Sequence, residues 1–330
     1  MFDGVSQFPK GFRIGVCGSR GFLGRRLVMQ ALDKSFEVVA FARTAESMGG
    51  QISTHGLDFA SQRAWDAIPA CMLDVVVYVA GRAHLKREDG ASQTELVKSN
   101  VIGVKNALDF ARRCGARRFV LASSISVYDF SSEGSKTEDS PCHPVGQYGE
   151  SKLAGERICL DAGDLEVVVV QLATLFGPGD IANIYGMVRA IKARRFFIPG
   201  RPQAQKSVLP VDLAAEIILR LAEEGGRGCS VLNAALPEAP SLREICDVFE
   251  EVCGFRRVPS LGPIASVAAG WAGDVASVVW RGCPFNSAVR RKISQSTVVS
   301  TDRLYATLDG LRPKPFVDWM RDYADYYRLK

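Results

Sequence analysis

Long apolar runs, paired cysteines and histidines are the features that this sequence has little of. The most apolar stretch, residues 264–280, is rich in alanine and glycine and contains Asp274. It is too short and too interrupted for a transmembrane helix, so we expect no integral membrane span. We interpret it as a buried helix of a second lobe. A helix lying in a membrane interface is the alternative.

Nine cysteines are scattered along the chain with no CxxC pair among them. Their number is odd, and several lie inside apolar runs, as Cys17 does in RIGVCG. We therefore expect reduced thiols in a cytoplasmic protein and no metal site. The first residues, MFDGVSQFPKGFR, lack the apolar core of a signal peptide, which supports the same location. Attachment at the periphery of the membrane stays open because of residues 264–280.

Charge of either sign is close to balanced. The formal net charge is +5 over 330 residues, which suits an anionic small-molecule substrate but is no footprint for nucleic acid. The length exceeds what one hydrophobic core usually serves, so we expect two domains or one domain with a lobe.

Apolar strands alternate with helices in the first half of the chain. Strands are predicted at 12–17, 36–42, 74–80, 117–124 and 165–173, and helices at 22–33 and 92–113 and around Tyr148. Strands that are apolar along their whole length predict an α/β fold with a doubly wound parallel sheet. From about residue 175 the pattern changes. We assign 1–174 mainly to a nucleotide-binding domain and 175–330 mainly to a smaller substrate lobe, with some chain returning to the sheet.

Two features of the second part are specific enough to test. Asp212 is placed to cap the long helix that follows it. The last thirty residues predict a terminal helix pair separated by a Pro-rich turn.

A glycine-rich turn follows the first strand. GSRGFLG places Gly18, Gly21 and Gly24 at GxxGxxG spacing, directly after a strand and at the start of a helix. Glycines there allow a tight bend and let backbone amides approach a pyrophosphate at the helix N-terminus. The turn therefore predicts a dinucleotide site.

The end of the second strand bears on which dinucleotide is bound. An NAD site usually has an acid there for the ribose hydroxyls, but Ala42 occupies that position and Arg43 follows. An arginine can pair with the 2′-phosphate of NADP, although a solvated loop arginine is an equal alternative. Asp58 could accept a hydrogen bond from the adenine amino group, with a plain turn aspartate as an equal alternative. The cofactor is thus NAD or NADP.

A tyrosine and a lysine four residues apart, Tyr148 and Lys152 in QYGESK, share one face of a helix. Together with the glycine turn, VAGRAH, NVIGVKNAL, SSISVY and LFGPGD, they give the chain its resemblance to the extended short-chain dehydrogenases/reductases. More narrowly, it resembles the nucleotide-sugar epimerase/reductase group of bacterial polysaccharide synthesis. The resemblance implies a Rossmann domain with a seven-stranded parallel sheet, a C-terminal substrate lobe and a homodimer.

The resemblance also assigns residues to roles. Its catalytic residues fall on Ser124, Tyr148 and Lys152. Substrate contacts fall on Ser124, and on Asn183 and Lys206 for a diphosphate. His84 follows the fourth strand, where it is either a plain loop residue, the interpretation that we prefer, or a substrate contact. Gln171 and Leu172 stand where the family usually has Arg-Pro. The residues expected at the dinucleotide are Gly18, Arg20, Gly21, Phe22, Leu23, Gly24, Arg43, Asp58, Phe59, Ala80, Gly81, Asn100, Tyr148 and Lys152.

These residue types suit hydride transfer at a sugar carbon. A free tyrosine, with a pKa of about 10, is a poor base at neutral pH. A lysine ammonium and a nicotinamide cation nearby would both lower that pKa. Ser124 would hydrogen-bond the substrate oxygen and orient it toward Tyr148.

Several functions remain open at this stage. Ser124 is followed by Ile125 and Ser126 instead of the Asp-Glu pair of the related dehydratases, which disfavours water elimination. A UDP-sugar 4-epimerase that keeps its NAD and a 4-keto-sugar reductase that exchanges NADPH both fit. A non-catalytic dinucleotide-sensing protein is the alternative from another class.

Overall fold

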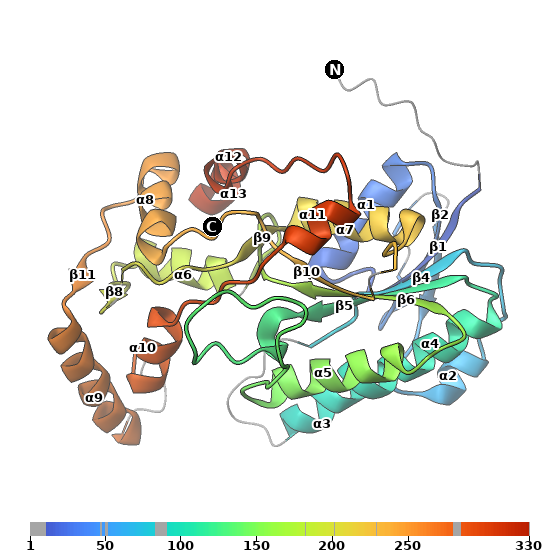
Figure 1. Cartoon of the computed structure of the whole chain (residues 1–330), viewed down its shortest axis with the longest axis horizontal. Helices are drawn as coiled ribbons and strands as arrows, with labels where there is room; N and C mark the ends of the chain where they lie inside the picture. Colours follow the sequence, from blue (N-terminus) through green and yellow to red (C-terminus); the bar gives the residue numbers. More distant parts are fainter. Residues whose placement is uncertain are drawn as a thin grey trace.

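A seven-stranded parallel sheet forms the centre of the molecule, shown as a computed structural model in Figure 1. The structure describes residues 11–46, 48–49, 52–82, 91–181, 183–200, 202–228, 230–279 and 285–329. The strand order is β10-β6-β5-β4-β1-β2-β3. These strands are β1 (Arg13–Cys17), β2 (Glu37–Ala42), β3 (Ser53–Gly56), β4 (Val75–Tyr78), β5 (Arg118–Ser124), β6 (Glu166–Leu172) and β10 (Val231–Ala234).

The register of the sheet aligns the carboxyl ends of its central strands. Ser124 pairs with Leu172 at the end of β5, and Cys17 pairs with Tyr78 at the ends of β1 and β4. The strand order reverses between β1 and β4, and the crevice at such a reversal is where doubly wound sheets bind ligands. The seven-stranded parallel sheet that the sequence predicts is confirmed.

Helices cover both faces of the sheet (Figure 1). On one face α1 (Phe22–Asp33) packs against α7 (Val211–Glu224). The other face carries α2 (Gln62–Asp66), α4 (Gly103–Arg113) and α5 (Gln147–Leu160). The predicted helix 92–113 is interrupted, because α3 (Ala91–Val97) and α4 are joined by a π-helical turn, η1 (Lys98–Ile102). Such turns often mark functional sites.

A smaller lobe lies across the carboxyl ends of the strands, on the left in Figure 1. It contains α6 (Asn183–Lys192), β8 (Ile198–Pro199), α8 (Leu242–Cys253), β11 (Ser260–Leu261), α9 (Pro263–Val279) and α10 (Ser287–Ser294). A short pair, β7 (Thr174–Phe176) and β9 (Val208–Pro210), connects it to the sheet. After α10 the chain returns alongside Lys206 and Lys136.

The predicted terminal helix pair is present. It consists of α11 (Asp302–Thr307) and a second helix divided into α12 (Phe316–Asp322) and α13 (Ala324–Leu329), with a Pro-containing turn between. The predicted cap at Asp212 is wrong, because α7 begins after Pro210 and has no side-chain cap. Asp212 lies inside the first turn, where it pairs with Arg26 at 2.5 Å and accepts a hydrogen bond from the Tyr323 hydroxyl at 2.5 Å.

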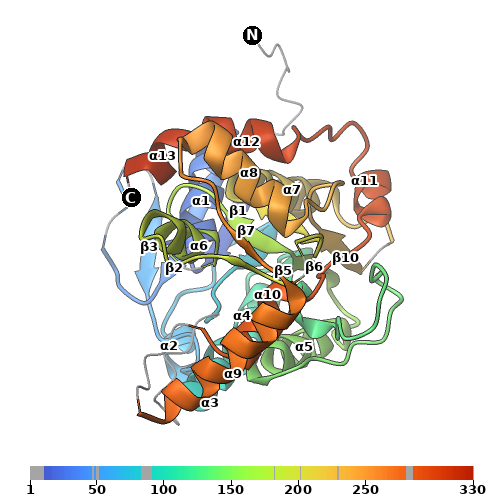
Figure 2. The same cartoon turned by 90° about the vertical axis from the view of Figure 1, so that its left-hand side faces the viewer.

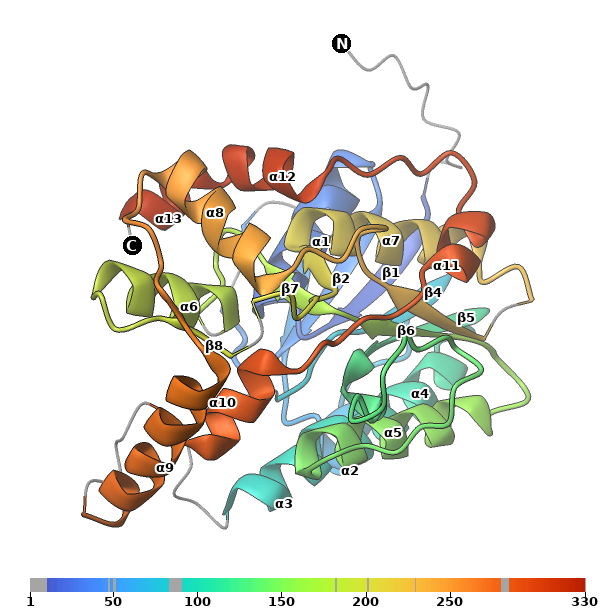
Figure 3. The same cartoon turned by 60° about the vertical axis from the view of Figure 1, so that its left-hand side comes forward.

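The predicted burial of residues 264–280 is also wrong. Residues 264–279 lie in α9, while residue 280 lies outside the described residues, and Ile264, Trp271 and Val275 are 88%, 69% and 73% exposed. Figures 2 and 3 show α9 at the outer end of the smaller lobe, packed chiefly against α10. None of the helices described is both long enough and apolar enough to cross a bilayer.

The glycine turn provides a stability test. A Cβ at Gly24 would overlap the carbonyl oxygen of Gly18, which is backbone and cannot rotate away. We expect Gly24→Ala to lower the free energy of unfolding by about 1–3 kcal/mol or more, as overpacking does, measured by thermal and urea denaturation. Gly163→Ala is the matched control, because a Cβ there meets open space and the backbone is not left-handed. Equal effects of the two changes would contradict the close packing of this turn.

Candidate active site

Ser124 and Tyr148 are brought together by the packing of α5 on the end of β5. Ser124 is the last residue of β5, and its Oγ accepts a hydrogen bond from the Ser126 backbone amide at 3.2 Å. The 3₁₀ turn η2 (Ile125–Val127) follows. A Cβ at Gly149 would collide with the Ser126 carbonyl oxygen, so the first turn of α5 lies directly on this turn. Close approach therefore requires glycine next to Tyr148.

The pKa of Tyr148 responds to this environment in two ways. Burial raises the pKa of the phenol, and the hydrogen bond with Ser124 lowers it. The net effect on the pKa of Tyr148 is upward. The lowering by Lys152 and a nicotinamide cation that the sequence predicts stays a prediction for the cofactor complex.

Lys152 lies buried one turn further along α5. Its ammonium donates a hydrogen bond of 2.8 Å to the Ala122 carbonyl oxygen of β5. Burial lowers the pKa of Lys152 to about 8, and the Glu156 carboxylate partly opposes this. A Cβ at Gly81 would lie 3.1 Å from the Lys152 nitrogen. The Lys152 ammonium therefore lies beside Gly81, in the loop after β4.

Asn100 fastens the loop after β4 to α5. It belongs to the π-helical turn η1 and is 1% exposed. Its Nδ2 donates to Ser151 Oγ at 2.9 Å, and its Oδ1 accepts from the Arg82 amide at 3.2 Å. Ser151 Oγ in turn donates to the Tyr148 carbonyl oxygen at 2.8 Å. Asn100 therefore joins the loop after β4 to the turn of α5 that carries Tyr148 and Lys152.

The sequence prediction missed a buried acid in this helix, Glu156. It is 2% exposed, and its carboxylate accepts hydrogen bonds from Ser123 Oγ and from Gln171 Nε2. Burial raises the pKa of Glu156, while Ser123, Gln171 and Lys152 lower it. Its spacing of four residues from Lys152 could have indicated the pairing.

Gln171 stands where the family that the sequence resembles usually has arginine, and it is also buried. Its Oε1 accepts a hydrogen bond from the Tyr128 hydroxyl at 2.6 Å. Gln171 therefore belongs to a polar network beneath the site, which extends through Tyr128 to Asn233.

The glycine turn and the loop after β4 form the middle of the predicted dinucleotide site. Gly18 has φ +92°, and a Cβ there would lie 2.6 Å from the Ala80 nitrogen. The backbone that follows β1 therefore packs closely against the backbone that follows β4. Gly21 precedes α1, whose N-terminal amides have no side-chain cap. These backbone donors at the strand-order reversal fit a pyrophosphate.

The predicted adenosine contacts line a second hollow. A cavity of about 280 Å³ is bordered by Arg43, Leu57, Asp58, Phe59, Ala60, Glu95, Lys98 and Ser99. Arg43 is exposed and follows the buried Ala42 at the end of β2. Arg20 also lies on this side of the glycine turn, where its guanidinium pairs with Glu46. Together these positions fit an extended dinucleotide with its nicotinamide end near Lys152.

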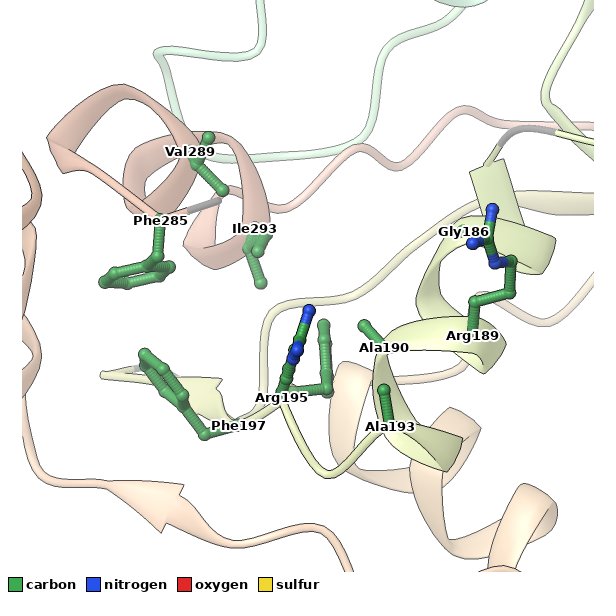
Figure 4. A pocket seen from close by; sticks show the side chains of 10 residues that line it. Gly186, Arg189, Ala190, Ala193, Arg195, Phe197, Phe285, Val289 and Ile293 are labelled. Carbon is green, nitrogen blue, oxygen red and sulfur yellow. The ribbon is translucent and has the colours of Figure 1, made fainter. Parts of the chain in front are cut away.

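The smaller lobe contains a cavity of about 310 Å³ between α6, residues 195–197 and α10. Phe197 and Phe285 pack against each other along one side of it, with ring centres 4.6 Å apart, and Val289 and Ile293 line another side (Figure 4). Arg189 and Arg195 supply its positive charge. An aromatic wall beside guanidinium groups suits a base linked to an anionic diphosphate.

Of the predicted substrate residues in this part of the site, the structure describes the side chain of Lys206 but not those of Asn183 and His84. The Lys206 ammonium donates to the carbonyl oxygens of Gln295 and Lys292 at the end of α10, and burial and Lys292 lower its pKa to about 8. Lys206 thus fastens the end of α10. Asn183 begins α6, but its side chain lies outside the described residues, as does His84.

A Rossmann sheet with a serine at the carboxyl end of β5, and a tyrosine and a lysine on the adjoining helix α5, has the fold and residue set of an extended short-chain dehydrogenase/reductase. The model of the NAD dependent epimerase/dehydratase family matches residues 14–235, more than half of the chain. The chain therefore belongs to that family. It is an NAD(P)-dependent enzyme of the nucleotide-sugar epimerase or reductase type.

The individual relatives share less than a third of their residues with this chain. UDP-glucose 4-epimerase 4 of Oryza sativa subsp. japonica is 28% identical over 293 residues, 75% of this chain and 78% of the relative. N-acetyl-alpha-D-glucosaminyl-diphospho-ditrans,octacis-undecaprenol 4-epimerase of Escherichia coli O157:H7 is 25% identical and covers 66% of this chain and 65% of its own length. The solved UDP-glucuronic acid 4-epimerase of Bacillus cereus, with UDP-glucuronic acid and NAD, has a TM-score of 0.72. It is 16% identical and covers 96% of this chain and 99% of its own.

Removal of the phenol tests the role of Tyr148. We expect Tyr148→Phe to lower kcat by about 10²–10⁴-fold, the usual contribution of a general acid–base group, with dinucleotide binding retained. Stopped-flow turnover and a fluorescence titration with NADH separate the two effects. Tyr305→Phe is the control, because that hydroxyl bonds the Ala235 carbonyl oxygen instead. Turnover that survives Tyr148→Phe would remove this residue from the chemistry.

The buried acid predicts a pH effect. The Glu156 carboxylate raises the pKa of Lys152, so Glu156→Gln should let that pKa fall below its present value of about 8. As pH is raised, the variant then loses the ammonium, and the activity that depends on it, sooner than the wild type does. The alkaline limb of the kcat/KM profile therefore moves toward neutral pH. Glu150→Gln, on the exposed side of α5, should leave the limb in place. An unmoved limb in Glu156→Gln, with the fold intact, contradicts the coupling.

Proposed function

We propose that the protein is a UDP-sugar 4-epimerase of cell-surface polysaccharide synthesis. The observation that carries the proposal is the pairing of Tyr148 with Ser124 at the end of β5, with Lys152 one turn further along α5, beside Gly81 and bonded to the Ala122 carbonyl oxygen. The rice and Escherichia coli relatives, both of them 4-epimerases, support the same reaction. The aromatic and basic cavity of the smaller lobe supports a nucleotide carrier.

The residues divide the work of epimerisation. The bound nicotinamide supplies the chemistry of accepting and returning a hydride. Ser124 holds the C4 oxygen, and Tyr148 takes the hydroxyl proton as the C4–H bond breaks. After the keto sugar rotates in the site, Tyr148 returns the proton to the C4 oxygen, and C4 then has the opposite configuration. Lys152 keeps a positive charge beside the phenol and the ribose end of the cofactor.

Dehydration receives no support from the residues after Ser124. Ile125 and Val127 are buried and Ser126 bonds to Ser124, so this turn presents no carboxylate to a substrate. The complete set of serine, tyrosine and lysine also leaves the non-catalytic alternative without support. The homodimer stays a prediction.

A specific observation favours a second candidate, an NADPH-dependent 4-keto-sugar reductase. β2 ends in the buried Ala42 where an NAD site usually has an acid, and the exposed Arg43 borders the adenosine-side cavity. A guanidinium there would pair with a 2′-phosphate.

The cofactor that remains with the purified protein separates the two candidates. For the epimerase we expect about one NAD per chain after denaturation and mass spectrometry, because the cofactor never needs to leave. NMR should show UDP-glucose and UDP-galactose, or their N-acetylated forms, converting to an equilibrium mixture without added dinucleotide. Arg43→Ala should leave both results unchanged.

The reductase makes the opposite forecast. A protein that is purified empty, prefers NADPH over NADH and loses that preference in Arg43→Ala would overturn the epimerase proposal. Oxidation of NADPH with a 4-keto UDP-sugar would then define the activity.

A further inference from the structure

The outward face of α9 is apolar. Ile264, Ala268, Trp271 and Val275 recur at intervals of four, three and four residues, which places them along one side of the helix. All four are exposed, three of them by more than two thirds. Figure 3 shows this helix at the extremity of the lobe, away from the sheet.

The inward face of α9 is made of small and polar residues instead. Ser266 is fully buried, and Gly270, Gly273 and Ser277 lie on the same side. A Cβ at Gly273 would overlap the Phe285 carbonyl oxygen, and one at Gly270 would lie 3.1 Å from Ser287 Oγ, so this face packs tightly against the start of α10. A surface helix of a globular protein buries its large apolar side chains. Here the polarity is reversed, which marks the outer face as a contact surface.

The same part of the chain carries the net charge of the protein. Six of the 41 Lys and Arg residues but one of the 36 Asp and Glu residues lie between 254 and 300, so this segment has a formal charge of +5. The remainder has 35 of each sign and is neutral. Arg256, Arg257, Arg291 and Lys292 are exposed. The one acid, Asp274, accepts a hydrogen bond from the Ser287 amide, and Arg291 contributes to lowering its pKa.

We propose that α9 lies in the headgroup region of an anionic lipid bilayer, with the neighbouring arginines and lysine on the phosphate groups. An apolar stripe with a tryptophan and a basic border is the composition of helices that lie in a membrane interface. At 17 residues α9 is about 25 Å long, so it lies along the surface instead of crossing it. Two copies meeting through this face would bring two +5 segments together, which disfavours self-association.

This contact is independent of the catalytic residues and goes beyond the proposed function. It also determines how the smaller lobe would be oriented relative to the membrane surface. Val289 and Ile293 of α10 line the cavity of Figure 4, and the other side of α10 receives α9. The membrane would therefore lie one helix away from that cavity.

Vesicle co-sedimentation of the full chain tests the proposal. We expect binding to vesicles of phosphatidylcholine with about 30% phosphatidylglycerol, weaker binding to phosphatidylcholine alone, and a decrease as salt is raised. The triple change Ile264→Ser, Trp271→Ser and Val275→Ser should weaken binding at least about tenfold. Met72→Ser is the matched control, because Met72 is as exposed as Trp271, at 69%, but lies elsewhere.

The charge contribution is tested separately. Arg256→Gln with Arg257→Gln should lower affinity for the anionic vesicles by roughly fivefold per cation removed, with little effect on neutral vesicles. Arg63→Gln with Lys105→Gln is the control pair on α2 and α4. Thermal denaturation should show all variants folded, since every replaced side chain is exposed.

Three outcomes would overturn the proposal. One is a wild-type protein that does not sediment with anionic vesicles. A second is a triple variant that binds as the wild type does. The third is an oligomer in sedimentation velocity that the triple change dissociates without any vesicle binding, which would make a second copy the occupant. Turnover of a water-soluble UDP-sugar by the triple variant should equal that of the wild type, so failure here and failure of the epimerase proposal are distinguishable.

Discussion

The close packing of α5 against two turns is the constraint on which the site depends. Gly149 lets the helix approach the turn after β5, and Gly155 lets it approach the carbonyl oxygen of Asn100 in the π-helical turn. A side chain at either position would move α5 outward. Tyr148 would then move away from Ser124, and Lys152 away from Gly81, because this one interface positions both side chains of α5.

Burial gives the site its electrostatic character. An amine in a dry environment tends to lose its proton, as the lowered pKa of Lys152 shows. Glu156 counteracts that tendency, but a buried carboxylate is itself costly unless it is hydrogen-bonded. Ser123 and Gln171 provide those bonds. The neutral Gln171 leaves the field of the acid to act on Lys152, which a cation at that position would weaken. The network beneath the site therefore bears on its charge as well as its shape.

The sequence predicts best what depends on local pattern. Continuous apolar strands, the glycine turn and the Tyr148–Lys152 spacing identify the sheet, the dinucleotide turn and the catalytic helix. Features set by distant contacts were missed or wrong. Asp212 has the residue type of a cap, but Arg26 and Tyr323 hold it inside the helix. The π-helical turn and the Gln171–Glu156 bonds likewise depend on partners far along the chain, which periodicity cannot reveal.

The error at α9 has a different physical origin. Apolar composition predicts burial only when the rest of the chain offers a surface to cover it, and α9 instead turns its glycines and serines toward α10. The family match ends at residue 235, before α9 and α10 begin. The segment that holds the net charge and the exposed apolar face therefore lies beyond the matched residues, although α10 within it also lines the cavity of the smaller lobe. One face of this helix pair thus serves the cavity, whereas the opposite face turns apolar side chains to solvent.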